Sequence, residues 1–464
     1  MLGPVASWWL LFALGAVLGG WTLVKHRPNL AVGACAALTL LCPTWVTIGS
    51  VPYVFDLRMA LACLMMIAYC FHPQGTLRYP HHWLDAVVLG LIVVHIFADL
   101  SKGGSLAAVP LRAVGEWSIP FLAGRCSVLF KGSVLWLAPW FSGAAVILGL
   151  GAIIESYFGL NLWEWLFFPM DDLVQRSREP RYDLIYRAVG PTRHPIFLAI
   201  VFLLLVPWPI ALMEQKESRV KRALGWVALA MIVLGMMATV SRGPLVGLAI
   251  AGVAAACLRW PRTRPFVLIG GVAIMAGAFF FSGELIQWME KTDTRGAGHG
   301  KLVELNNEGV VYTDTRNRLF VWKIYGPLVV RAGLFGYGTQ AVSSFPPNIP
   351  GLPPSARAAE TLGIVDNSYL LFGLRFGWIG LALLIALLGG AIVTAISHRR
   401  VAGIVFYPYG AAFLTALASV LIGVAPEIAT VFFSYEFAYW ILFHCGVVTG
   451  LASCHQRLLR GADT

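Results

Sequence analysis

Basic side chains stand at three separate points of the sequence, each directly before or at the start of an apolar segment. They are Arg187, Arg193 and His194 in RAVGPTRHPIF, Arg242 in TVSRGPLVG, and Arg316 and Arg318 in TRNRLFVWKIYG. A guanidinium group is a planar fork that stays charged and pairs with two phosphate oxygens at once. The start of a helix adds a partial positive charge that also favours anions. The pattern therefore predicts a pyrophosphate site, provided that the three points meet in space, because a lone arginine at a membrane boundary more often only anchors its helix.

The elements that must position these residues are membrane helices. Hydrophobic residues make up 58% of the 464 residues and charged residues only 12%, whereas soluble domains carry about 25% charged residues. Crossing a bilayer takes roughly 17–25 apolar residues. Thirteen segments approach that length, and the sequence therefore predicts an all-α, polytopic membrane bundle of about 12–13 transmembrane helices. The segments are approximately 5–24, 30–50, 54–71, 83–100, 106–124, 133–158, 195–213, 223–240, 243–258, 266–282, 366–395, 401–423 and 431–452.

Lysine and arginine residues of the short connections indicate the orientation of the bundle. They fall on alternate connections, and by the positive-inside rule that side is the cytoplasm. Two long polar segments then lie outside, and because unsatisfied backbone groups are costly in hydrocarbon, they must emerge from the membrane. We expect N-terminal helices in 1–158, a first periplasmic loop in 159–194, central helices in 195–282, a large periplasmic loop with short helices in 283–365, and C-terminal helices in 366–464.

Other features narrow the class of function. The net charge of +11 is ordinary for a membrane protein with basic inner loops, and no patch of interleaved basic and aromatic residues indicates nucleic-acid binding. No acidic pair in the early outer connections suggests a metal site, so we expect neither a metal nor a cofactor. Glu116 and Glu427 stand in apolar surroundings, where ionisable residues are costly and are functional candidates.

Four segments, in this order around the large polar loop, resemble the O-antigen ligase and O-antigen polymerase superfamily. They are RAVGPTRHPIFLA, SRGPLVGLAI, RNRLFVWKIYGPLVVRAGLFGYG and DNSYLLFGLRFGWIGLALL, and they span roughly residues 180–400. The resemblance implies a glycosyltransferase of the bacterial inner membrane with its active site facing the periplasm. Such an enzyme takes a glycan from undecaprenyl pyrophosphate and passes it to an acceptor sugar.

The resemblance also implies roles for residues. Arg187 and Arg318 match the family's loop arginines near the diphosphate, and Arg242 matches the arginine of its SRG motif. Ligases commonly have His-Asn where this chain has Asp366-Asn367, and an aspartate can accept a proton from a sugar hydroxyl. We therefore expect metal-independent, inverting transfer. The catalytic residues would be Asp366, Arg187 and Arg318, and the substrate-binding residues would be Arg242, Arg193, His194, Arg316 and Asn367.

The aspartate favours a polymerase of O-antigen or exopolysaccharide repeat units. The alternative is a ligase that uses lipid A–core oligosaccharide, or a protein, as the acceptor. Expected partners are the lipid-linked donor glycan, the acceptor glycan, membrane lipids and, for a polymerase, a chain-length regulator protein. Two rival classes remain: a lipid-linked oligosaccharide flippase, for which internal repeats are typical, and a non-catalytic scaffold of an envelope assembly complex.

Overall fold

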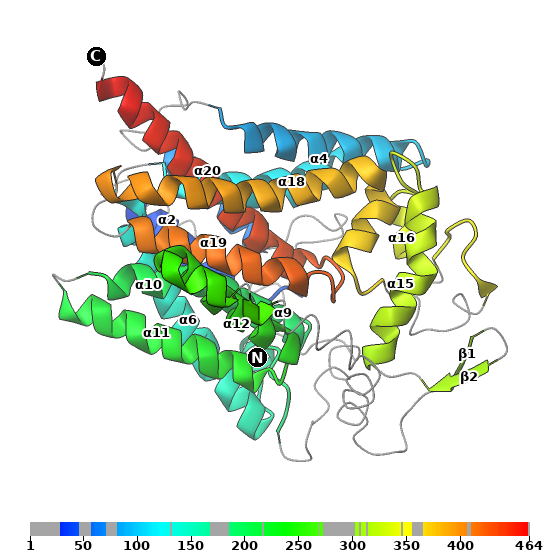
Figure 1. Cartoon of the computed structure of the whole chain (residues 1–464), viewed down its shortest axis with the longest axis horizontal. Coiled ribbons are helices and arrows are strands. Elements are labelled where there is room, and N and C mark those ends of the chain that lie inside the picture. The colour runs from blue at the N-terminus through cyan, green and yellow to red at the C-terminus, as the bar shows by residue number, and fades with distance from the viewer. Residues whose placement is uncertain are drawn as a thin grey trace.

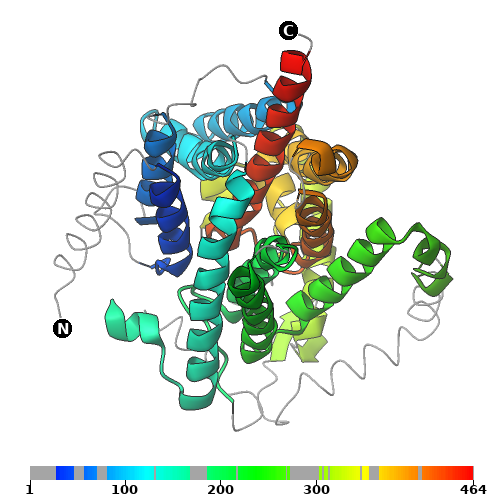
Figure 2. The same ribbon diagram turned by 90° about the vertical axis from the view of Figure 1, so that its left-hand side faces the viewer.

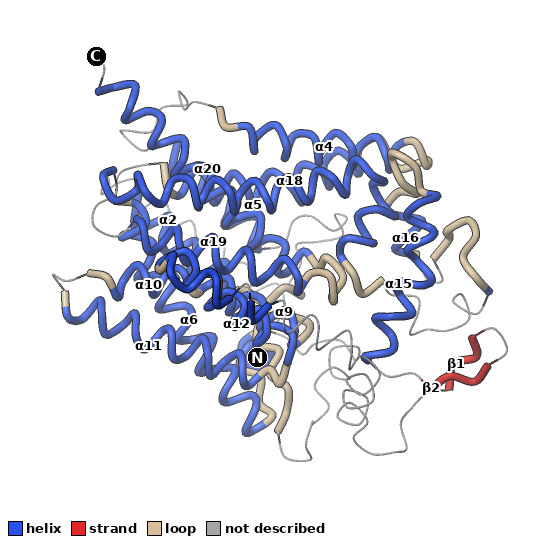
Figure 3. The backbone as a smooth tube through the Cα atoms, viewed as in Figure 1, coloured by secondary structure: helices blue, strands red, loops and turns tan. Residues whose placement is uncertain are grey.

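The fold is a bundle of helices, as the sequence predicts (Figure 1). The computed structural model describes residues 28–45, 57–70, 81–129, 132–167, 185–215, 218–267, 269–271, 302–305, 308–311, 314–344, 347–354, 365–405 and 410–462. Among them, a small antiparallel hairpin that the sequence did not predict joins β1 (Leu302–Leu305) to β2 (Glu308–Val311) (Figure 3). Its register pairs Leu302 with Val311.

The long helices run side by side, and their packing is clearest in the view along the bundle (Figure 2). Within the described residues, seven helices, with α9 and α10 counted together, are long and apolar enough to cross a membrane, and three shorter apolar helices accompany them. The bundle helices are α2 (Pro28–Leu41), α3 (Leu57–Cys70), α4 (Trp83–Leu100), α5 (Ala108–Ser127), α6 (Ser133–Phe158), α9 (Pro195–Leu205), α10 (Pro207–Met213), α11 (Arg219–Ala238), α12 (Arg242–Arg259), α18 (Ser368–Val405), α19 (Gly410–Glu427) and α20 (Tyr435–Ala462). Shorter elements are α7 (Leu162–Leu166), η1 (Pro261–Thr263), α15 (Asp314–Arg331) and α16 (Thr339–Ser343).

The structure divides one predicted span and shifts the boundary between two others. The span 195–213 is divided at Val206, because Pro207 and Pro209 follow and proline cannot donate a helical hydrogen bond. Helix α18 continues to Val405, past the predicted end at 395, so the next helix begins only at Gly410. The predicted span 5–24 and most of 266–282 lie outside the described residues.

The two ends of the bundle differ in character. We call the end where α15 and α16 lie the loop end, which is on the right in Figure 1. At the opposite end, Arg125 pairs with Asp85 at 2.6 Å between Nη1 and Oδ1. There too, Arg399 Nη1 donates to the carbonyl of Leu258 at 2.7 Å. Arg125 and Arg399 stand on short connections that were predicted to share one side of the membrane, and both lie at this end.

Helix α20 forms the centre of the bundle, and its apolar span is buried throughout. It packs closely against α5, because glycines allow the two backbones to touch. A Cβ atom at Gly124 would collide with the carbonyl of Phe443, and one at Gly446 would collide with the carbonyl of Phe121. Close approach of this kind is the usual role of small residues in membrane helix pairs.

A side chain at Gly124 should therefore separate α5 from α20. We expect Gly124→Val to destabilise the protein by at least about 1–3 kcal/mol, the usual cost of overpacking, and to lower its melting temperature in detergent. The matched control is Gly143→Val on α6, where a Cβ meets nothing within 4 Å. Equal melting temperatures for the two variants would contradict this account of the packing.

The apolar-periodic residues after Arg316 predict a helix, and α15 (Asp314–Arg331) forms there. It docks on α18. Its buried face carries Val321, Tyr325 and Leu328, which belong to a second hydrophobic cluster at the loop end.

Candidate functional site

A cavity of about 380 Å³ opens at the loop end, between α5, α18, α20 and the segment before α9. Its walls are largely aromatic, from Trp117, Phe197, Phe372, Phe376, Phe432, Phe433, Tyr435 and Tyr439. Its polar lining is mostly charged and consists of Arg112, Glu116, Arg193, His194, Arg375, Ser434 and Glu436. Three guanidinium groups from distant parts of the chain thus share one partly apolar space.

The backbone beside Arg193 is fixed by a buried carboxylate. Glu436 accepts a hydrogen bond from the Arg193 N–H at 3.0 Å and another from the Thr44 hydroxyl at 3.0 Å. His194 caps α9, because its Nδ1 accepts from the N–H of Ile196 at 3.3 Å. The Arg193 side chain itself is 42% exposed, and its Nε lies 4.0 Å from Glu436. Its position is therefore set by the backbone, and its charge stays available to the cavity.

A kink in α18 positions Arg375. Gly377 has φ +66°, and a side chain there would collide with the backbone of Leu334. The kink exposes helical backbone groups, and the preceding loop satisfies them: the N–H of Tyr337 donates to Leu374 O at 2.7 Å and that of Gly338 to Arg375 O at 3.1 Å. Burial raises the pKa of the Tyr337 phenol, so this hydroxyl stays protonated.

The Arg375 side chain reaches from the kink toward α16. Its Nη2 donates to the Ser343 hydroxyl at 2.8 Å, while its Nε has no hydrogen-bond partner in the described part of the chain. Arg112 lies near it, and its Nε pairs with Glu116 one turn along α5 at 2.7 Å. Both side chains of this pair are about a quarter exposed (29% and 24%), so water weakens the attraction between them.

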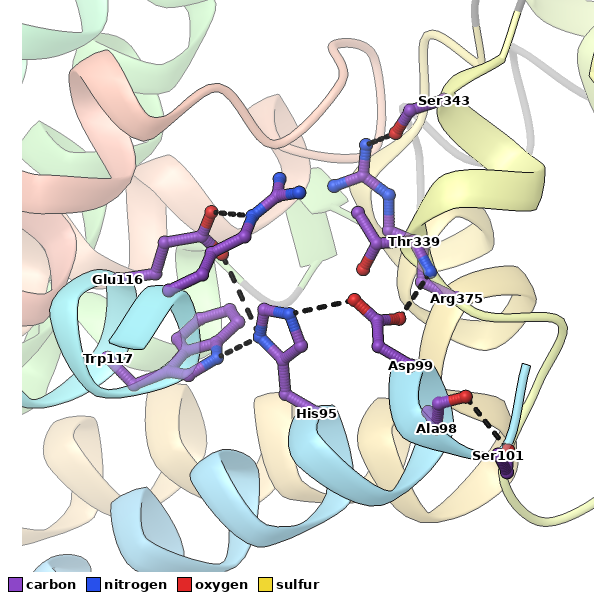
Figure 4. Close-up of polar contacts among 10 residues, drawn as sticks. His95, Ala98, Asp99, Ser101, Glu116, Trp117, Thr339, Ser343 and Arg375 are labelled. Atoms are coloured by element: carbon purple, nitrogen blue, oxygen red, sulfur yellow. Dashed lines mark hydrogen bonds and ion pairs between the residues drawn. The ribbon is translucent and has the colours of Figure 1, made fainter. Parts of the chain in front are cut away.

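Behind the cavity, a buried polar network joins three helices (Figure 4). The indole N–H of Trp117 donates to His95 Nδ1 at 3.0 Å, so the proton of a neutral His95 is on Nε2. That nitrogen faces Asp99 Oδ2 at 3.3 Å. The other carboxylate oxygen accepts from the backbone N–H of Thr339 at 2.6 Å. The network therefore ties α5 through α4 to the first residue of α16.

Two of the predicted site residues, Arg193 and His194, line the cavity. Arg187 is close to them in sequence, but its side chain contacts the turn before α12 instead. Its Nη2 is 3.4 Å from the Ser241 hydroxyl, and its Nε is 3.5 Å from Thr239 O. Arg187 is buried. It thereby supports the turn that leads into α12, where the exposed Arg242 is the first residue.

Arg318 reaches the same region from α15. It is close enough to Glu427, the last residue of α19, for the two charges to interact. Glu427 in turn packs on the start of α12, where a Cβ at Gly243 would lie 2.6 Å from its Oε2. Arg187, Arg242 and Arg318 therefore gather around the start of α12, and none of them lines the cavity. The side chain of Arg316 lies outside the described residues.

Asp366 and Asn367 lie between the arginines of the cavity and the arginines around the start of α12. The Asn367 amide donates to Ala429 O at 2.6 Å, and its oxygen accepts from Leu370 N–H at 3.0 Å, which caps α18. Ser368 N–H donates to Ile428 O at 2.8 Å. The anchored segment runs from Glu427, beside Arg318, to Phe432 in the cavity wall. Asp366 is half-buried beside it but is not part of the cavity lining.

Of the charged residues at the cavity, Glu116, Arg193 and His194 were named from the sequence, whereas Arg112, Arg375 and Glu436 were not. His95 and Asp99, in the network behind the cavity, were not named either. These residues could have been found in the sequence because each is an ionisable residue inside an apolar segment. Two pairs also have the four-residue spacing of an ion pair on a helix: His95 with Asp99, and Arg112 with Glu116.

Within the described residues, no group of three or more His, Cys, Asp or Glu side chains could hold a metal ion. Residues 226–385 match a family model described as O-antigen ligase. The match runs from α11 through α12, α15 and α16 into α18, so it includes Arg242, Arg318, Asp366 and Arg375. No curated protein matches the chain.

Proposed function

We propose that this membrane protein, a member of the O-antigen ligase and polymerase superfamily, transfers a glycan from undecaprenyl diphosphate to an acceptor sugar at the loop end. The loop end would face the periplasm, and the protein would reside in the bacterial inner membrane. The observation that carries the proposal is the cavity in which Arg112, Arg193 and Arg375 meet aromatic walls.

The cavity suits a diphosphate with an apolar tail. Glu436 is already bonded to Thr44 and to backbone, and Glu116 is paired with Arg112. Arg193 and Arg375 therefore remain to bind phosphate oxygens as planar forks. The aromatic walls offer apolar surface to the isoprenoid and ring faces to the sugars.

The proposed chemistry breaks the bond between the anomeric carbon and a diphosphate oxygen, and it forms a bond from that carbon to the acceptor hydroxyl oxygen. Fixed guanidinium groups stabilise the negative charge that develops on the leaving diphosphate. Asp366 would accept the proton of the acceptor hydroxyl. Attack opposite the leaving group inverts the anomeric centre, and no metal is required.

The remaining predicted residues receive supporting roles in this proposal. Arg187 holds the turn before α12, and Arg242 and Arg318 supply further positive charge for substrates that bind around Glu427. Asn367 fixes the backbone next to Asp366. The aspartate favours a repeat-unit polymerase that acts with a chain-length regulator, and a ligase is the second candidate because the matched family model is described as O-antigen ligase.

Purified protein in detergent should form new glycosidic bonds. With lipid-linked repeat units extracted from the cells that make the protein, mass spectrometry should show dimers of the repeat and free undecaprenyl diphosphate. Lipid A–core offered in the same assay distinguishes a ligase from a polymerase. Transport of lipid-linked glycan across sealed vesicles, with no new bond in detergent, would instead identify a flippase.

A further inference from the structure

We propose that a second pocket at the loop end binds the acceptor glycan and selects one that carries an acidic group, a carboxylate or a phosphate. The pocket measures about 640 Å³ and lies between the outer ends of α4 and α5 and helix α16. The proposal rests on the proposed function, because it names the second substrate of the same reaction.

The lining of the second pocket is polar, in contrast to the aromatic cavity. Its hydrogen-bonding and charged residues are Asp99, Lys102, Ser105, Arg112, Thr339, Gln340, Ser343 and Ser344. Hydroxyl and amide groups of this kind match the hydroxyls of a sugar, whereas an isoprenoid tail would leave them unsatisfied. The donor lipid is therefore better placed in the aromatic cavity and the acceptor in the second pocket.

The charge around the pocket favours an anion. Three positively charged side chains lie in or beside the pocket, those of Lys102, Arg112 and Arg375. Two negatively charged side chains, those of Asp99 and Glu116, offset them in part. Asp99 is occupied by His95 and Thr339, and Glu116 by Arg112. Lys102 is exposed and takes part in no ion pair among the described residues. Its ammonium group is therefore available to an acidic sugar.

Hydrogen bonds hold the walls of the second pocket in place. The hydrogen bond from Thr339 N–H to Asp99 fixes α16 against α4, although the two residues are 240 positions apart in sequence. The bond from Arg375 to Ser343 fixes the far end of α16 against α18 (Figure 4). A binding site whose walls are held in place loses less entropy when its ligand binds.

Arginine side chains connect the two spaces. Arg112 lines both the cavity and the second pocket. Arg375 lines the cavity, and the residue to which it donates, Ser343, lines the pocket. An acceptor in the second pocket would thus lie next to the guanidinium groups that are proposed to bind the donor diphosphate, as a transfer between two substrates requires.

The first test is binding without a donor. Purified protein in nanodiscs is mixed with trigalacturonic acid or neutral galactotriose, and saturation-transfer NMR reports which probe is bound. We expect the acidic probe to bind about tenfold more tightly than the neutral one, and Lys102→Ala to remove the difference, as loss of a charged hydrogen bond predicts. Lys221→Ala, at an exposed lysine of the opposite end, should keep it. Equal binding of the two probes by the wild type would overturn the proposal.

The second test uses the transfer reaction. Lys102→Ala and Gln340→Ala should each raise KM for the acceptor severalfold, while kcat and KM for the donor stay within about twofold. A rise in KM for the donor instead would place the donor in this pocket and overturn the assignment. Charge-selective binding of trigalacturonic acid in a protein that makes no glycosidic bond would reject the proposed function but not the acidic-sugar site.

Discussion

Replacing Arg193 with alanine should reduce the rate of glycan transfer by about 10²–10³-fold, the usual cost of removing one fixed donor to a developing charge. The reason lies in how this arginine is held. Glu436 bonds to its backbone N–H at 3.0 Å, while the side chain reaches the cavity and remains 42% exposed. The substitution therefore removes the charge from the cavity and keeps the backbone contact, so the melting temperature should change little. Single-turnover transfer in detergent, followed by mass spectrometry, measures the effect.

Two further variants test whether the guanidinium itself is responsible. Arg193→Lys keeps the charge but loses the planar fork, so it should recover only part of the rate. Arg219→Ala, at an exposed arginine of the opposite end, should transfer glycan at the wild-type rate. A transfer rate for Arg193→Ala within twofold of the wild type would show that the cavity does not hold the diphosphate.

Helix positions could be predicted from the sequence because they depend on local patterns. Runs of apolar residues fix the spans, and a proline or a capping residue fixes where a helix begins. His194 caps α9, and Pro195 is its first residue. The helix after Arg316 follows from the same reasoning.

Which charged residues meet could not be predicted in the same way. The contact between Asp99 and Thr339 joins residues 240 positions apart, and no local pattern encodes it. Arg375 reaches the cavity beside a kink that depends on Gly377 and on the loop that packs against it. In the sequence, this glycine is indistinguishable from others in apolar helices. The sequence could therefore indicate that arginines matter at the loop end, but not which of them share a cavity.

The structure separates the predicted arginines into two groups joined by one segment. Arg193 faces the cavity, and Arg318 faces Glu427 on the other side. The segment between α19 and α20 connects them, and Asn367 anchors the start of α18 to it. Arg187, Arg242 and Arg318 thus lie together around the start of α12, next to a cavity that has its own arginines. Asp366 lies beside the segment that links the two.

Removing the Asp99 carboxylate should cause the largest loss of stability at the loop end. Asp99→Ala leaves the buried N–H of Thr339 without an acceptor and removes the carboxylate that lies 3.3 Å from His95 Nε2. An unsatisfied buried donor costs about 1–3 kcal/mol, so we expect a loss of at least about 1–3 kcal/mol. Release of α16 should also abolish binding of trigalacturonic acid in the second pocket. Thermal unfolding in detergent and the NMR assay measure the two effects.

A double variant tests the arrangement of protons in this network. In Asp99→Asn, the amide oxygen can still accept from Thr339, but the NH₂ group faces the Nε2–H of His95, and two donors oppose each other. His95 cannot move its proton to Nδ1 while Trp117 donates to that atom at 3.0 Å. Trp117→Phe removes this constraint, so Asp99→Asn should be less destabilising in the Trp117→Phe background than in the wild type. Strictly additive effects of the two substitutions would show that His95 does not donate to Asp99.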